Sequence, residues 1–121
     1  MIKLYENDPR DLYEQLASEL IRLISEGKLR EGDQLPSIRS LASSLQVNTK
    51  TVQAAYQLLA DKGFILQRKK ARAIVQISSE ADWLHYWTPT IENFANEAKA
   101  RGFSLDDCLS LFQQTYKERL S

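Results

Sequence analysis

The chain has 121 residues, of which 43% are hydrophobic and 26% are charged, a composition typical of a globular protein with one modest core. Its 16 basic and 16 acidic residues cancel, and its single cysteine and single histidine exclude an internal disulfide, a cysteine-based zinc cluster and a histidine metal site, so we expect no metal and no cofactor. The chain has no apolar run of roughly 18 residues and no basic-then-apolar leader, which favours a cytoplasmic protein without a membrane partner.

The first predicted element is a helix that begins at Asp8–Pro9 or at Asp11, because aspartate caps helices and proline is tolerated in the first turn. Gly27 marks its end, and Glu31–Asp33 is typical of a turn whose neighbours can pair as a short strand. Apolar residues recur along this helix at the helical period, which indicates a core helix: Leu12, Leu16, Leu20, Leu23 and Ile24.

Two short amphipathic helices are predicted between Leu35 and Gly63, and only Gln46, Val47 and Asn48 separate them. Ser37 and Asn48 can cap their N-termini. The apolar stripe of the first helix is Ile38, Leu41, Ala42 and Leu45, and that of the second is Val52, Ala55, Tyr56 and Leu59. So short a connection makes the helices cross steeply. This is the helix-turn-helix arrangement, in which the second helix enters the DNA major groove by its N-terminus.

The first turns of the second helix are polar and carry no acidic residue: Asn48, Thr49, Lys50, Thr51 and Gln53. The helix dipole and the free N–H groups at this end suit phosphate oxygens. Asparagine and glutamine can pair with adenine, lysine with guanine, and threonine with phosphate or a thymine methyl. A polar, cap-rich first turn is also typical of any surface helix, so this pattern alone leaves both interpretations open.

After Gly63 the apolar pattern changes to a period of two, in residues 64–68 and 72–77, which predicts a β-hairpin. A hairpin that follows the second helix of such a pair is a wing. Four basic side chains gather at its turn, where they can lie on phosphates or in the minor groove: Arg68, Lys69, Lys70 and Arg72. The alternative is a solvated hairpin tip whose lysines protect a sheet edge.

Ser78–Ser79 marks a boundary, and the chain after it is helical again. Thr88–Pro89 either kinks one long helix or begins a second one, and Ser104–Asp107 resembles a capping box that opens a last helix through Leu120. The helices carry more large apolar residues than a two-helix hairpin can leave in water, so we expect a second copy to bury them; packing on the head of the same chain is the alternative. The expected dimerisation residues are Trp83, Trp87, Ile91, Phe94, Leu105, Leu109, Phe112 and Tyr116.

The predicted fold is mainly α with a small β-hairpin. Residues 1–77 are predicted to form a winged helix-turn-helix domain, and residues 78–121 a two-helix dimerisation tail. The first part carries 12 basic against 9 acidic residues and the second 4 against 7, an asymmetry that fits a DNA-facing head and an acidic part with another role.

The stretch LPSIRSLASSLQVNTKTVQAAYQLLADKGFI, residues 35–65, resembles the signature of GntR-family transcriptional regulators, LPS-x-R-x-LA-x-x-L, then V, then T-V-x-x-AY-x-x-L, then G. The preceding LYEQLASELIRLISEGKLREGDQLP is similar to the first helix and connector of that family, so the resemblance covers about residues 11–77. The short two-helix tail resembles the YtrA-type subfamily. The resemblance implies a bacterial regulator in which Arg39 contacts DNA and Lys69–Lys70 forms the wing tip.

Three departures from the family pattern bear on the site. Asn48-Thr49 replaces the usual Ser-Arg, so the arginine that commonly reads guanine is missing. Gln46 stands where glycine usually makes the turn, and the sequence KKARA replaces the G-x-G of the wing. A stiffer or differently shaped wing follows from the last change.

The leading hypothesis is a homodimeric, sequence-specific DNA-binding regulator, most simply a repressor, that acts on a two-fold operator. The alternative is a winged-helix protein-interaction module that has lost DNA binding. We find no nucleophile–base pair and no phosphate-binding glycine loop, so we expect no enzyme activity. The sequence does not identify a small-molecule effector. The candidate DNA contacts are Ser37, Arg39, Asn48, Thr49, Lys50, Thr51, Gln53, Arg68, Lys69, Lys70 and Arg72.

Overall fold

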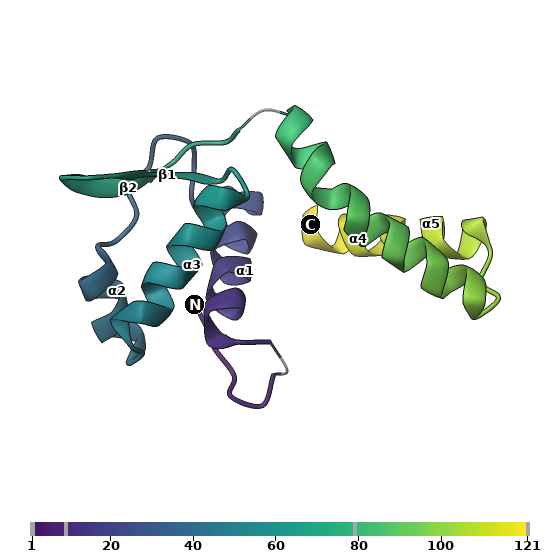
Figure 1. Ribbon diagram of the computed structural model, residues 1–121, viewed down its shortest axis with the longest axis horizontal. Helices are drawn as coiled ribbons and strands as arrows, with labels where there is room; N and C mark the ends of the chain where they lie inside the picture. The colour runs from purple at the N-terminus through teal and green to yellow at the C-terminus, as the bar shows by residue number, and fades with distance from the viewer. Residues whose placement is uncertain (1, 9, 79, 121) are drawn as a thin grey trace. The chain divides into compact units, whose positions relative to one another are not determined.

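The computed structural model describes residues 2–8, 10–78 and 80–120. The chain divides into two compact units, Met1–Ser79 and Glu80–Ser121, which we call the head and the tail. In the described part of the chain, the head holds three helices and a hairpin, and the tail holds two helices (Figure 1).

Helix α3 (Thr49–Asp61) is the centre of the head. It packs against α1 (Leu12–Ser25), against α2 (Ile38–Leu45) and against strand β1 (Ile65–Arg68), which pairs with β2 (Ala71–Val75). Figure 1 shows α3 alongside α1, with the hairpin at the end of α3 from which β1 departs. A three-helix core with a hairpin after its last helix is the winged arrangement that the sequence predicts.

The core of the head is built from the apolar stripes of these elements. All four residues of the predicted α3 stripe are buried, as are Leu16, Leu20 and Leu23 of the α1 stripe. The predicted inward face of α3 is therefore confirmed, and that of α1 is confirmed in its central residues, while Leu12 and Ile24 are half-buried. The largest fully buried side chains are Tyr56, Leu16, Leu35, Leu59, Val52 and Val75.

The first helix begins after Asp11, whose side chain makes no capping hydrogen bond. Of the two predicted starts, Asp8–Pro9 lies in part outside the described residues, because Pro9 is not among them. The Asp8 carboxylate instead accepts from the Arg10 guanidinium at 3.0 Å and from the Arg10 backbone N–H at 2.9 Å. These contacts with Arg10 lower the pKa of Asp8.

Gly63 is required where α3 turns into the hairpin. Its φ of +84° lies in the left-handed region that side chains disfavour. A Cβ at this position would also collide with the side chain of Ser78, whose backbone N–H donates to the Gly63 carbonyl at 2.8 Å. The glycine therefore both ends α3 and lets the end of the head pass close to it.

The hairpin has a two-residue turn, Lys69–Lys70, one residue shorter than the sequence predicts. Arg68 pairs with Ala71, and the register shifts between Leu66 and Arg68. Neither lysine has a positive φ, so the turn is not of the type that Asn-Gly makes. A register shift of this kind bends the strand and increases its local twist.

The connector before α2 runs beside β2. Gln34 forms a bridge with Ile74, the Leu35 N–H donates to the Ala73 carbonyl at 2.8 Å, and the Gly32 N–H donates to the Val75 carbonyl at 2.8 Å. The short strand predicted next to the Glu31–Asp33 turn is therefore a single bridge. It ties the start of the helix pair to the hairpin.

In the tail, α4 (Glu80–Ala100) is one helix with Pro89 inside it, and α5 (Leu105–Leu120) follows a short turn. Of the two alternatives at Thr88–Pro89, the structure shows continuation rather than a second helix. The capping box at α5 is confirmed, because Ser104 and Asp107 each accept the backbone N–H of the other, at 3.0 and 2.9 Å. Hydrogen bonding with Ser104, through its backbone N–H first and its side chain second, lowers the pKa of Asp107.

Tyr56 places a polar group in this core. Its ring is 2% exposed, and its hydroxyl donates to the carbonyl of Pro36 at 2.7 Å, across 20 residues of sequence. Burial raises the pKa of Tyr56 to about 12, since the phenolate would lose its water, and the nearby Arg72 charge acts weakly in the opposite direction.

Tyr56→Phe removes this hydroxyl. Below about pH 10 we expect the variant to lose about 1 kcal/mol of unfolding free energy with the hydrogen bond. The unfolded chain ionises the tyrosine near pH 10, whereas the folded chain keeps it neutral to about pH 12, so the stability advantage of wild type over the variant falls as the pH rises through that window. Urea unfolding at about pH 8 and about pH 11 measures the difference. An advantage of wild type that is equal at both pH values would contradict the assignment.

Candidate nucleic-acid interface

The turn between α2 and α3 keeps the geometry that glycine usually provides, although Gln46 occupies it. Gln46 has φ 57° and ψ 45°, and it is the non-glycine residue with positive φ in the described part of the chain. The Val47 N–H donates back to the Ala42 carbonyl at 3.0 Å, which closes the end of α2. The backbone therefore accepts strain to bring the N-terminus of α3 directly after α2.

The N-terminus of α2 presents Ser37 and Arg39. The Ser37 hydroxyl oxygen accepts the Ser40 N–H at 3.1 Å, so it caps the helix as the sequence predicts. Arg39 is exposed, and no hydrogen bond or ion pair to another described residue occupies its guanidinium. Its five N–H groups are free to bind an anion from outside.

The N-terminus of α3 is the other half of the surface. Asn48 caps it through its side-chain oxygen, which accepts the Lys50 N–H at 2.9 Å. That oxygen is therefore occupied, and Asn48 cannot use it to pair with adenine while the cap is in place. Thr49, Lys50 and Gln53 are exposed, and Thr51 is half-buried. The first turn thus offers one ammonium and one amide to a base edge.

Basic residues are concentrated in the second half of the head. Residues 34–79 contain seven Lys or Arg and one acidic residue, Asp61, whose carboxylate accepts from Gln57 at 2.9 Å. Residues 1–33 contain eight acidic residues, and the ion pairs between described residues of the head lie here, as in Arg22–Glu26 at 2.9 Å. Arg22 and then Lys28 lower the pKa of Glu26. Positive charge therefore outnumbers negative charge in the helix pair and the hairpin.

The hairpin divides its four predicted contacts into two kinds. Lys69 and Lys70 are exposed at the turn. Arg68 instead donates from Nε and Nη2 to the Arg72 carbonyl, at 2.8 and 2.6 Å, and Arg72 donates from Nε to the Leu35 carbonyl at 2.8 Å. Both arginines are exposed, but Nε of Arg72 and two nitrogens of Arg68 are bonded to the head's own backbone. Sequence reasoning missed this, because an alternating pattern does not show a contact across 37 residues.

The tail presents a separate apolar surface. Leu105 is 73% exposed and Phe112 66% exposed, and on α5 these residues share one helical face with Leu109 and Tyr116. All eight predicted dimerisation residues are exposed within the single chain: Trp83, Trp87, Ile91, Phe94, Leu105, Leu109, Phe112 and Tyr116.

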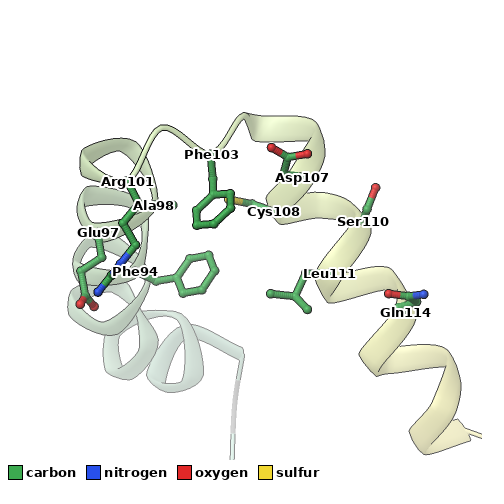
Figure 2. Close-up of a pocket in the computed structure, with 10 residues that line it drawn as sticks. All are labelled: Phe94, Glu97, Ala98, Arg101, Phe103, Asp107, Cys108, Ser110, Leu111 and Gln114. Atoms are coloured by element: carbon green, nitrogen blue, oxygen red, sulfur yellow. The ribbon is translucent and has the colours of Figure 1, made fainter.

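A hollow of about 590 Å³ lies between α4 and α5. Figure 2 shows the rings of Phe94 and Phe103 and the side chains of Cys108 and Leu111 directed into it, while Ser110 points away. Its floor is therefore apolar. In the described chain, no three His, Cys, Asp or Glu side chains are grouped to hold a metal ion, and no helix is long and apolar enough to cross a membrane.

Three packed helices, a tight turn before α3 and a basic hairpin after it define a winged helix-turn-helix protein of the DNA-binding regulator class. Residues 12–75 match the family model described as bacterial regulatory proteins, gntR family. The chain belongs to the GntR family of transcriptional regulators.

Two YtrA proteins support the YtrA-type subfamily. The chain is 35% identical over 65 residues to the HTH-type transcriptional repressor YtrA of Bacillus subtilis, which covers 54% of this chain and 50% of that protein. It is similar to the solved structure of YtrA from Sulfolobus acidocaldarius, a GntR-family transcription factor, with 38% identity, a TM-score of 0.69, and coverage of 82% and 97% of the two chains.

The curated relatives are longer than this chain. The pyridoxine biosynthesis regulator PdxR of Corynebacterium glutamicum is 39% identical over 64 residues, which are 53% of this chain and 14% of that protein. The chain therefore spans between 14% and 50% of the length of these two relatives. The residues that match the family model, 12–75, lie within the head.

The strained turn can be tested with Gln46→Gly. Glycine adopts φ near +57° without a Cβ clash, so we expect the variant to gain about 1 kcal/mol of unfolding free energy. Gln46→Ala, which keeps the Cβ, is the matched control and should gain nothing. Urea unfolding of the three proteins measures the change. A glycine variant that is less stable than wild type would show that the turn is not strained.

Proposed function

We propose that the protein is a homodimeric, sequence-specific transcriptional repressor that reads a two-fold operator with the N-terminus of α3. The observation that carries this proposal is the first turn of α3, where Lys50 and Gln53 are exposed and no acidic residue precedes Asp61. The repressor named YtrA among the relatives supports the direction of regulation. Such a protein works where the chromosome is, so a cytoplasmic location is part of the proposal.

The exposed groups suit the two kinds of contact that a DNA reader makes. Lys50 can donate to guanine and Gln53 can pair with adenine in the major groove, which gives sequence preference. The free N–H groups at the start of α3, with Thr49 and Thr51, suit phosphate oxygens. Ser37 and Arg39 at the start of α2 and the lysines of the hairpin turn supply phosphate contacts on either side.

The dimer is proposed from the tail. A face with Leu105 73% exposed and Phe112 66% exposed leaves large apolar side chains in water, and burying them is favourable by about 25 cal/mol per Å². A second copy offers the same face, so a two-fold contact satisfies both. The dimer would then present two α3 helices to half-sites about one helical turn, roughly 34 Å, apart.

Selection of bound duplexes from a random pool tests the function. We expect an inverted repeat at near-physiological salt. On the recovered duplex, Lys50→Ala should lower affinity roughly tenfold or more, because it removes a base contact. Lys62→Ala, at the other end of α3, is the control and should change affinity much less. Recovery of no duplex by the folded protein would favour a protein-interaction module, and equal affinity of Lys50→Ala and wild type would refute the assigned role of α3.

Phe112→Glu tests the dimer. A carboxylate in the centre of the α5 stripe would have to be buried without a partner, so we expect a monomer at concentrations where wild type is dimeric. Gln113→Glu adds the same charge one residue further along, off the stripe, and should remain a dimer. Sedimentation velocity distinguishes the two states. A Phe112→Glu variant that sediments as wild type does would show that this face is not the interface.

A further inference from the structure

Two side chains from different elements hold the two residues that precede the helix-turn-helix. Arg72 of β2 donates from Nε to the Leu35 carbonyl at 2.8 Å, and Tyr56 of α3 donates to the Pro36 carbonyl at 2.7 Å. Leu35 is itself 1% exposed, and its N–H is bonded to the Ala73 carbonyl at 2.8 Å. The hairpin and α3 are therefore tied to adjacent peptide groups, immediately before the Ser37 cap of α2.

We propose that Arg72 is a positioning residue that fixes the hairpin against the helix-turn-helix, and that it is not one of the phosphate contacts. The proposal rests on the proposed DNA-binding function. A guanidinium whose Nε donates inward to a backbone carbonyl is held in one orientation, and the carbonyl gains a charge-assisted hydrogen bond. The Nε donor of Arg72 is therefore used to hold the geometry of the head rather than to bind a phosphate.

Two further contacts stabilise the same arrangement. Arg68 donates two hydrogen bonds to the Arg72 carbonyl, at 2.8 and 2.6 Å, next to the register shift of the hairpin. Gln67 donates to Gln57 of α3 at 3.2 Å. The hairpin is thus anchored to α3 through β1 and to the connector through β2. Only its turn, Lys69–Lys70, extends beyond these ties.

This anchoring gives a reason for the sequence KKARA. A two-stranded hairpin is marginally stable alone, and a mobile wing would have to be ordered when DNA binds, which weakens binding. Because the strands are bonded to the head, the wing is already ordered before DNA binds. Lys69 and Lys70 are then held at a fixed position relative to Lys50 and Arg39, and they alone supply the phosphate contacts of the wing.

The salt dependence of binding distinguishes a positioning residue from a phosphate contact, because each phosphate contact adds about 0.9 to the slope of log affinity against log salt concentration. Three variants are compared with wild type on the duplex recovered by selection: Arg72→Met, Arg72→Lys and Lys70→Met. We expect Arg72→Met to bind about tenfold more weakly, the effect of one charge-assisted hydrogen bond, with the slope of wild type. Lys70→Met should reduce the slope by about 0.9.

Arg72→Lys keeps the charge but loses the guanidinium geometry. We expect it to bind as weakly as Arg72→Met, whereas a phosphate contact would tolerate lysine. In the free proteins, amide hydrogen exchange at Leu35 and Val75, whose N–H groups join the connector to β2, should be faster in both Arg72 variants than in wild type and Lys70→Met, under conditions where all four are folded.

Three results would overturn the proposal: a slope in Arg72→Met that falls as in Lys70→Met, full affinity in Arg72→Lys, or unchanged affinity of the folded Arg72→Met protein. If wild type binds no duplex, the proposed function fails instead. In that case exchange at Leu35 still decides whether Arg72 fixes the hairpin, and unchanged exchange refutes it.

Discussion

The structure of the head depends on helix α3, which buries one face completely and leaves its N-terminus exposed. Val52, Ala55 and Leu59 have no exposed surface, and they pack where α1, α2 and β1 meet the helix. With that face fixed, the helical period directs the residues between them outward. Lys50 and Gln53 are exposed because Val52 is buried, so the same packing that stabilises the fold also selects the residues of the proposed DNA surface.

The orientation of α3 also depends on the backbone that leads into it. Gln46 in a left-handed conformation allows α3 to start with only three residues between it and the end of α2, and the Tyr56 hydroxyl donates to the Pro36 carbonyl before α2 begins. The left-handed conformation of Gln46 costs about 1 kcal/mol. The bond from Tyr56 to Pro36 is a buried hydrogen bond, which is stronger in the core than in water. The helix pair is therefore held at its turn and at its entrance, and the hairpin is tied to the same entrance through Arg72.

The parts of this structure that follow from local sequence could be predicted. Apolar period gave the stripes of α1 and α3, and the Ser104–Asp107 box and Gly63 located helix ends, because each depends on residues within one or two turns. The inward ties of Arg68 and Arg72 could not be predicted, since a basic residue in a hairpin has the same pattern whether it faces a carbonyl or a phosphate. The continuation of α4 through Pro89 could not be predicted either, because the spacing of apolar residues does not show whether a helix continues through a proline.

The apolar surfaces of the tail favour contact with a second copy of the chain. Its two helices leave an apolar hollow between them, lined by Phe94 and Leu111, and α5 carries a second apolar face in which Leu105 and Phe112 are exposed. One helix hairpin cannot cover both surfaces, because each helix has only one side toward the other. The proposed two-fold contact would cover the outer face of α5 in both copies at once. The distribution of charge fits this proposed division, since the tail is net acidic and the basic residues of the head are concentrated in its second half.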